Sequence, residues 1–317
     1  MTTTTLTRRQ VLQHAGVLMT GVAVGGGGAA AGQTTPASQA GTLVIGRDLT
    51  VNRLGFGAMR LVGPDVWGEP LDREAAKAVL RRAVELGVNF IDTADAYGPA
   101  TDEVLIAEAL HPYPKGLVIA TKGGIVRPSR ERWDRDGRPE HLRAACEASL
   151  KRLRVERIDL YQLHAIDPNV PLEDSLGEIA KLQREGKVRH VGVSNFDADE
   201  LARARKVVDV VSVQNRYNVS DRSSDAVLAV CARDGLAFIP WSPLSQSPRD
   251  SHAGARAALE GWAKAHGVSF PQAAIAWLLA RSPAMLPIPG TSSLAHLEEN
   301  VAAAAVRLTD AEMRAIG

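Results

Sequence analysis

The chain has 317 residues, 45% of them hydrophobic, enough for one large domain whose core needs neither disulfides nor a structural metal. Its formal net charge is +1, so no broad basic surface favours nucleic acid or an anionic membrane as partner. Cys146 and Cys231 lie in helical patterns without a CxxC motif. We therefore interpret them as small buried thiols, and we predict no metal site.

The first forty residues differ from the rest. Thr7-Arg8-Arg9-Gln10-Val11-Leu12 resembles a twin-arginine export signal, and a Gly/Ala-rich stretch over 15–31 follows that is too weakly apolar to predict a membrane span. Residues 29–31 and 38–40 are candidate signal-peptidase sites. We expect export to the periplasm or the exterior by the twin-arginine machinery. The alternative is a cytoplasmic protein with a disordered leader or a misassigned start. In both cases we expect 1–40 to lie outside the fold and 41–317 to form the domain.

From residue 41, apolar runs alternate with amphipathic helical patterns, as is typical of parallel βα units. Runs at 42–45 and 49–51 predict a β-hairpin at the start of the domain. Strands are then predicted at 53–56, 89–91, 117–120, 158–163, 189–193, 210–214, 237–240 and 285–287. Eight strands with intervening helices favour an α/β fold, a closed (β/α)₈ TIM barrel with an N-terminal hairpin.

Capping residues support the predicted helices. Asp72 is placed to cap the first helix and Gly87 to end it, and Pro139 opens the third. Capping boxes begin at Asp197 and Ser269. The competing fold is a doubly wound open sheet. Against it, no GxGxxG motif occupies the first βα turn.

Four polar residues follow or end different predicted strands. Asp92 ends the second strand, Tyr97 lies in the loop beyond it, Lys122 ends the third and His164 the fourth. In a barrel these positions meet at one face. A buried Asp92 and Lys122 would need to pair with each other. Lys122 beside Tyr97 would lower the pKa of the phenol below its usual value of about 10, giving a general acid, and His164 would orient a carbonyl group.

The segments around these residues resemble the aldo-keto reductase superfamily over about residues 51–300. The matching motifs are Asn89-Phe-Ile-Asp-Thr-Ala-Asp-Ala-Tyr-Gly98, Val118-Ile-Ala-Thr-Lys122, Ile158-Asp-Leu-Tyr-Gln-Leu-His164 and Val188-Arg-His-Val-Gly-Val-Ser-Asn-Phe196. The resemblance implies a barrel that reduces a small-molecule carbonyl with NADPH, and a catalytic tetrad of Asp92, Tyr97, Lys122 and His164.

The resemblance also places the nicotinamide half of the cofactor. Ser194, Asn195 and Gln214 match residues that bond the carboxamide, and Trp241 matches an aromatic that stacks on the ring. Ser242, Pro243 and Leu244 match the segment that embraces the pyrophosphate. Met59 and Arg60 match the loop after the first strand, which also contacts the dinucleotide.

The adenosine half is implied at residues 288–300, with Glu299 and Asn300 on the adenine. Two residues depart from the family here. Gly290 stands where well-known members have a lysine, and His296 where they have an arginine. Thr291, Ser292 and Ser293 at a helix start remain available to a 2′-phosphate, because a helix N-terminus favours anions. We therefore expect NADPH, with NADH still open.

Seventeen residues follow Asn300, too few for the long tail that closes the pocket in some relatives. We expect an open pocket with walls from Trp67, Arg127, Trp133 and Tyr217. Residues 52–64 and Trp67-Gly-Glu-Pro70 most resemble a bacterial branch that includes pyridoxal reductases, which makes pyridoxal a candidate substrate.

Two other functions stay open. One is a cofactor-binding regulatory subunit, since proteins of this fold act as β-subunits of potassium channels. The other is a lyase that forms a Schiff base on Lys122, because barrel aldolases place a lysine on a strand. The lyase leaves Tyr97, Ser194 and Gln214 without a role.

Overall fold

The computed structural model describes residues 35–244 and 252–317. The twin-arginine motif, the Gly/Ala-rich stretch and the first candidate cleavage site all lie outside the described residues. Within the described residues, no helix has the length and apolar character needed to cross a membrane.

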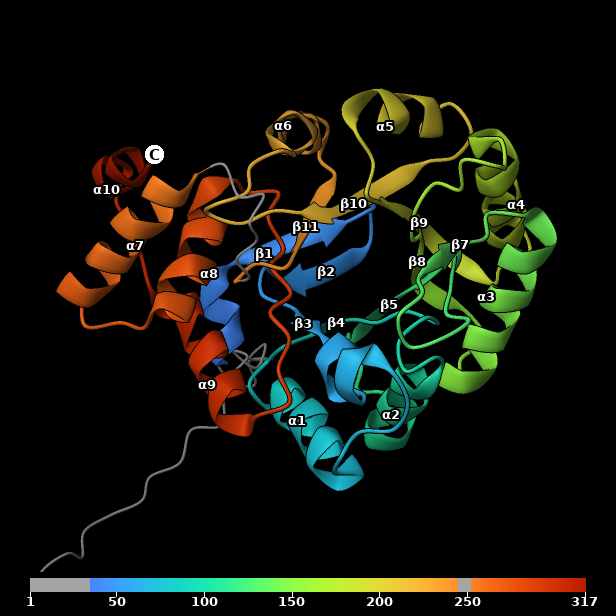
Figure 1. The fold of residues 1–317 in the computed structure, drawn as a ribbon, viewed down its shortest axis with the longest axis horizontal. Coiled ribbons are helices and arrows are strands. Elements are labelled where there is room, and N and C mark those ends of the chain that lie inside the picture. The colour runs from blue at the N-terminus through green and yellow to red at the C-terminus, as the bar shows by residue number, and fades with distance from the viewer. Residues whose placement is uncertain (1–34, 245–251) are drawn as a thin grey trace, which may run out of the picture. The chain divides into compact units, whose positions relative to one another are not determined.

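Seven parallel strands form one curled sheet in the order β3-β4-β5-β8-β9-β10-β11 (Figure 1). They are β3 (Phe56–Gly57), β4 (Phe90–Asp92), β5 (Val118–Gly123), β8 (Ile158–Leu163), β9 (Val188–Ser194), β10 (Val210–Arg216) and β11 (Ala237–Trp241). Residues 285–287 close the gap between the two edge strands. Met285 bridges Phe238 of β11, and the Gly55 N–H donates to the Pro287 carbonyl at 2.9 Å. The predicted barrel is confirmed. Its eighth strand stays short because Pro287 lacks an N–H for the ladder.

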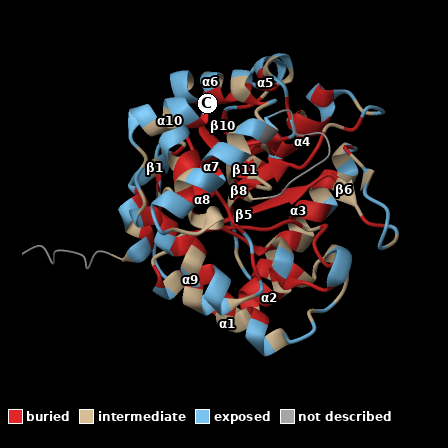
Figure 2. Ribbon diagram, turned by 60° about the vertical axis from the view of Figure 1, so that its left-hand side comes forward, coloured by how far each residue is buried: buried red, intermediate tan, exposed pale blue. Residues whose placement is uncertain are grey.

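Helices surround this sheet. They are α1 (Arg73–Glu85), α2 (Thr101–Leu110), α3 (Pro139–Leu153), α4 (Leu172–Arg184), α5 (Ala198–Ala204), α6 (Asp225–Asp234), α7 (Ala253–Ala265), α8 (Phe270–Arg281), α9 (Leu294–Ala302) and α10 (Asp310–Ile316). Of these, α7 and α10 pack on α8 rather than on the strands. Figure 2 shows burial concentrated on the strands and exposure on the outer helix faces. The Asp72 cap and both predicted capping boxes are present.

Two antiparallel hairpins lie outside the barrel sheet. The predicted one, β1 (Thr42–Ile45) with β2 (Leu49–Asn52), packs Ile45, Leu49 and Val51 against the barrel interior. The second, β6 (Ile125–Val126) with β7 (Asp134–Arg135), was not predicted. Its two strands are too short to show an alternating pattern, yet this hairpin carries residues beside the site described below.

The predicted domain boundary at residue 41 is wrong by several residues. A short 3₁₀ helix, η1 (Pro36–Ala40), belongs to the same folded unit as the barrel. Ala37 is fully buried among residues of α1, its N–H donates to the Leu86 carbonyl at 3.0 Å, and Arg307 donates to the Gln39 carbonyl at 2.6 Å. The candidate cleavage site at 38–40 therefore lies in packed structure. Small residues such as Ala37 fit a tight contact as well as a cleavage site, so composition could not separate the two.

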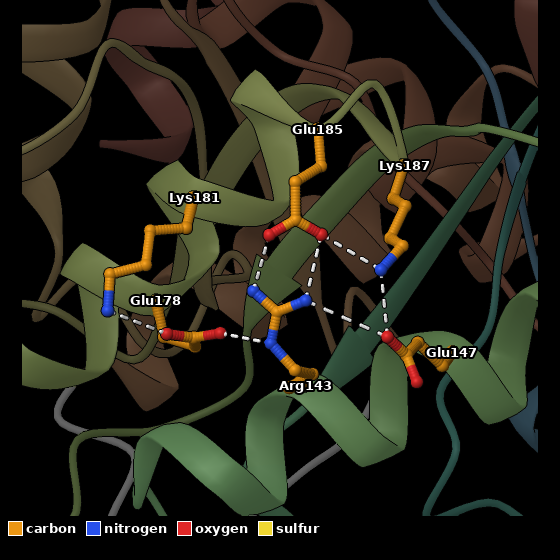
Figure 3. A network of polar contacts seen from close by, with 6 residues as sticks. All are labelled: Arg143, Glu147, Glu178, Lys181, Glu185 and Lys187. Atoms are coloured by element: carbon orange, nitrogen blue, oxygen red, sulfur yellow. Dashed lines mark hydrogen bonds and ion pairs between the residues drawn. The ribbon is translucent and has the colours of Figure 1, made fainter.

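Charged side chains join α3 to α4 on the outer surface (Figure 3). Arg143 donates to Glu178 at 2.6 Å and makes two bonds to Glu185, at 2.8 and 2.6 Å. Lys187 then links Glu185 to Glu147, at 2.8 Å to each. Such networks fix geometry better than single exposed pairs. This one sets the position of the turn that leads from α4 into β9.

Neither cysteine shows signs of chemistry. Cys146 on α3 and Cys231 on α6 are free and buried, and burial raises the pKa of each thiol to about 12. Among the described residues, no cluster of three or more His, Cys, Asp or Glu side chains is placed to hold a metal ion.

Candidate active site

The barrel brings the four predicted catalytic residues to one end. Asp92 is the last residue of β4, Lys122 lies near the end of β5, and His164 directly follows β8. Tyr97 lies in the loop after β4. All four are buried. Because parallel strands end at the same rim, residues far apart in sequence meet there.

Asp92 and Lys122 form a buried ion pair. The Lys122 Nζ donates to Asp92 Oδ1 at 2.6 Å and to the Thr93 carbonyl at 2.8 Å. Burial alone would lower the pKa of Lys122, but attraction to Asp92 and Tyr97 raises it overall. The lysine is thus held as an ammonium. A Schiff base needs a neutral amine, so this geometry argues against the lyase alternative.

The Lys122 ammonium also reaches the phenol. Its Nζ lies 3.4 Å from Tyr97 Oη, a long hydrogen bond. The expectation of a lowered Tyr97 pKa is wrong for the protein as it stands. Burial raises the pKa of Tyr97, and Lys122 lowers it only in part. Desolvation disfavours a buried phenolate more than one nearby cation favours it.

His164 is a neutral imidazole. Burial first, and then the Lys122 charge, lower its pKa well below the usual value. Its ring lies edge-on to the Tyr97 ring, with centroids 5.9 Å apart. Its Nδ1 is buried without a hydrogen-bond partner among the described residues. A neutral imidazole can donate one hydrogen bond to a carbonyl oxygen without adding a charge.

Two glutamines hold the other oxygen of Asp92. Gln162 of β8 donates to Asp92 Oδ2 at 3.2 Å and Gln214 of β10 at 2.7 Å. Gln162 was not among the predicted site residues. Its place in strand 158–163, two residues before His164, puts its side chain on the same face as the histidine, which is the signal that could have identified it.

A cavity of about 170 Å³ opens beside these residues and adjoins a larger one of about 510 Å³. Lining residues of the smaller cavity include Gly57, Asp92, Tyr97, Gln214, Trp241, Ser242, Pro243 and Leu244. Thr291 and Ser292 line the larger one, and Met59, Arg60 and Gly290 line both. Most of the predicted cofactor residues therefore border one continuous region.

Close backbone packing explains the departure at Gly290. A Cβ there would collide with the Gly57 carbonyl oxygen and touch the Arg60 side chain. A lysine could not occupy this position without a backbone shift. The exposed Arg60 has no hydrogen bond or ion pair to any described residue, which leaves a free cation between the two cavities.

Ser194 and Asn195 at the end of β9 and Trp241 at the end of β11 form a hydrogen-bonded row. The Asn195 amide donates to the His164 carbonyl at 3.0 Å and to Ser194 Oγ at 3.1 Å, and Trp241 Nε1 donates to Asn195 Oδ1 at 3.0 Å. Asn195 adopts φ +62°, an uncommon left-handed conformation that asparagine tolerates. The row holds Trp241 at the rim of the smaller cavity.

The start of α9 is organised by hydroxyl groups. Ser293 Oγ caps the helix by accepting from the His296 N–H at 3.4 Å, and Thr291 Oγ1 accepts from the Ser293 N–H at 3.0 Å. Their O–H groups remain able to donate. His296 is exposed, Glu299 half-buried and Asn300 buried. None of these three lines the two cavities.

Three of the four predicted pocket residues form one cluster. The Arg127 guanidinium carbon lies 3.7 Å from the Trp133 ring centroid and 5.4 Å from that of Trp67. Trp133 is 41% exposed and stands edge-on to Tyr97 at 6.5 Å between centroids. Trp133 therefore borders the catalytic end, and Arg127 supports it from behind.

The fourth pocket prediction, Tyr217, is wrong. Its ring is fully buried, stacked on Trp277 of α8, and its hydroxyl donates to Asp225 at 2.5 Å. The side chain points into the helix layer. Tyr217 directly follows β10, and alternation along an extended chain sends successive side chains to opposite faces.

The comparisons with known proteins agree with this geometry. Residues 53–317 match the model of the aldo/keto reductase family. An uncharacterized oxidoreductase of Schizosaccharomyces pombe is 50% identical over 280 residues, 88% of this chain and 90% of that protein. Pyridoxine 4-dehydrogenase of Escherichia coli is 42% identical over 268 residues, 82% of this chain and 92% of that protein.

Solved structures show the same fold. A thermostable aldo-keto reductase solved with the inhibitor epalrestat superposes with a TM-score of 0.75 at 32% identity, covering 87% of this chain and 98% of that one. An aldo-keto reductase of Klebsiella pneumoniae, solved with NADPH, gives 0.72 at 26% identity, with 87% and 93% covered. Fold, buried tetrad and relatives lead to one conclusion: the chain belongs to the aldo/keto reductase family of oxidoreductases.

Proposed function

We propose that this protein reduces an aldehyde or ketone to the alcohol, taking the hydride from NADPH and the proton from Tyr97. The observation that carries the proposal is the buried row Asp92–Lys122–Tyr97, which ends on the cavity that Gln214, Trp241 and Gly290 also line. A proton donor, a cation behind it and a binding space are thereby adjacent.

The protein's own groups divide the work. Tyr97 donates its proton to the substrate oxygen as negative charge develops there, and Lys122 stabilises the phenolate that remains. The neutral His164 donates a hydrogen bond that orients the carbonyl. Asp92, held by two glutamines, keeps Lys122 charged. When bound, the nicotinamide supplies the hydride.

The residues present fit a phosphorylated dinucleotide. Arg60, which pairs with no described residue, offers a cation between the cavities, and Thr291 and Ser292 line the larger one. Ser293 and the exposed His296 lie at the start of α9, where the helix dipole favours an anion. The solved Klebsiella relative was crystallised with NADPH. These features support NADPH over NADH, with Trp241 beside the nicotinamide.

For the substrate we propose a flat aromatic aldehyde of the pyridoxal type. The exposed Trp133 ring stands at the catalytic end and offers a surface on which an aromatic ring can stack. The Escherichia coli relative named pyridoxine 4-dehydrogenase supports the same chemistry.

The test is turnover of NADPH and NADH against pyridoxal and a panel of benzaldehydes and ketones. We expect turnover of aromatic aldehydes with NADPH. Tyr97→Phe should lower kcat by on the order of 10²–10⁴-fold while the NADPH dissociation constant, measured by fluorescence titration, stays within about twofold. Full turnover in Tyr97→Phe, or no turnover of any carbonyl by the wild type, would overturn the proposal.

A further inference from the structure

Helix α2 begins with two buried acids for which the proposed chemistry has no use. Asp102 and Glu103 are both fully buried. Glu103 is satisfied: it accepts from Thr121 Oγ1 at 2.5 Å and from Arg152 Nε at 2.6 Å. Asp102 accepts only from Thr93 Oγ1, at 2.7 Å, and its Oδ1 has no partner among the described residues. A buried, half-satisfied carboxyl is costly and calls for a reason.

Asp102 is bonded to both ends of the segment that carries the proton donor. Its side chain accepts from Thr93, the first residue after β4, and its backbone N–H donates to the Tyr97 carbonyl at 3.3 Å. The Thr93 carbonyl in turn accepts from Lys122 Nζ at 2.8 Å. Asp102 is therefore linked to the Lys122 ammonium by two hydrogen bonds through Thr93, and to Tyr97 by one backbone hydrogen bond.

We propose that Asp102 is a positioning residue of the carbonyl reduction: through Thr93 it fixes the carbonyl that holds Lys122, and through its backbone it fixes the Tyr97 loop. This inference rests on the proposed function. The Lys122–Tyr97 contact is long at 3.4 Å, so a small displacement of either partner would break it.

The charge of Asp102 also acts on the site. Burial, the largest cause, raises its pKa to about 7. The charged groups around it are Asp92 on β4, Lys122 on β5, Tyr97 in the loop, and Glu103 on α2, which pairs with Arg152 of α3. An ionised Asp102 raises the pKa of Tyr97 and opposes Lys122. Below pH about 7 the neutral acid no longer opposes Lys122, whereas burial and Asp92 still raise the pKa of Tyr97.

Variants of Thr93 and Asp102 separate the effect of hydrogen-bonded position from the effect of the Asp102 charge. Thr93→Val removes the hydroxyl and keeps the shape, so we expect kcat to fall by roughly tenfold to a hundredfold through misplacement, with NADPH affinity unchanged. Thr93→Ser keeps the hydroxyl and should restore kcat. Asp102→Asn keeps an acceptor for Thr93 and removes the charge, so the pKa of Tyr97 should fall, and any change in kcat should be smaller than in Thr93→Val.

The Tyr97 titration is followed as tyrosinate absorbance in stopped-flow pH jumps, with Tyr97→Phe as the blank, and melting temperatures are recorded for each variant. The positioning role would be refuted if Thr93→Val kept the wild-type kcat and the wild-type Tyr97 titration. It would also be refuted if Thr93→Val and Asp102→Asn changed the melting temperature and nothing else. Should Thr93→Val fail to fold, Asp102→Asn and Thr93→Ser still decide through the titration. The titration needs no turnover. A wild type that binds NADPH but reduces no carbonyl would therefore refute the proposed function and leave this inference testable.

Discussion

At the scale of single residues, the proposed chemistry depends on the acidity of the Tyr97 phenol. Burial raises the pKa of Tyr97, whereas Lys122 lowers it, and in the protein described above burial prevails. Lys122 can act only because Asp92 keeps it charged in a buried place. The charge of Lys122 therefore depends on Asp92, and the pKa of Tyr97 depends on Lys122, so the three residues act as one unit.

Lys122→Met should raise the pKa of Tyr97 further, since the lowering charge is gone. Reduction requires the protonated phenol and alcohol oxidation requires the phenolate. The pH at which oxidation begins should therefore move upward, and kcat for reduction should fall by on the order of 100-fold, because phenolate is no longer stabilised. Rates of carbonyl reduction and of alcohol oxidation, each measured as a function of pH, test this prediction.

The same variant leaves Asp92 buried without its cation, at a cost of about 3–5 kcal/mol in the free energy of unfolding. Adding Asp92→Asn should recover much of this stability but none of the rate. A double variant as unstable as Lys122→Met would contradict the pairing.

At the scale of elements, Arg127 joins two loops beside the site. Its guanidinium donates to the carbonyls of Asp65 and Val66 at 3.2 and 3.0 Å, and to those of Arg130 and Arg132 at 2.6 and 3.1 Å. Asp65 and Val66 have φ +59° and +58°. A β-branched residue rarely adopts this conformation, so the bonds from Arg127 hold strained backbone.

Arg127→Met should release both loops and displace Trp133. Since Trp133 borders the pocket, whereas the Asp92–Lys122 pair lies on strands, KM for an aromatic aldehyde should rise by about tenfold, with kcat changing less. Steady-state kinetics separate the two constants. Arg130→Met is the matched control, because the Arg130 side chain is half-exposed and, among the described residues, pairs only with Asp65, at 3.7 Å. Equal effects of both variants would refute the specific role of Arg127.

At the scale of the molecule, the folded unit begins earlier than composition indicates. A chain starting at Thr34 should fold with the full stability of the barrel, because it keeps the buried Ala37 and the bond from Arg307 to Gln39. A chain starting at Gly41 loses both and should melt at a lower temperature, by a few degrees for each ~1 kcal/mol lost. Thermal unfolding followed by circular dichroism compares them; identical melting curves would show that η1 contributes nothing.

Export by the twin-arginine route stays a prediction, carried by Arg8-Arg9 and the Gly/Ala-rich stretch after them. Arg8→Lys with Arg9→Lys should retain the protein inside cells that otherwise export it, since the route recognises the paired arginines. Fractionation and mass spectrometry of the N-terminus test this. A wild-type protein that stays in the cytoplasm with its first residues intact would refute it.

Local rules predicted the elements well where hydrogen bonding and periodicity decide structure. The strand at 158–163, the first hairpin and the capping boxes at Asp197 and Ser269 are local patterns, and all are present. The order of the strand-end motifs also placed Asp92, Tyr97, Lys122 and His164 at one rim. The hairpin β6–β7 and the packing of η1 were missed, because short segments are fixed by their neighbours and carry no periodic signal.

The sequence by itself therefore determined the barrel, the family and the strand-end positions of the four predicted catalytic residues, because each depends on local pattern and strand order. Only the tertiary structure decided that Tyr97 has a raised pKa, that Tyr217 faces the helices, and that Gln162 and Asp102 support the ion pair. Those outcomes depend on burial and on distances between groups remote in the chain. Desolvation and hydrogen bonding act through space, and no sequence pattern records how deeply a group is buried or which partner it meets.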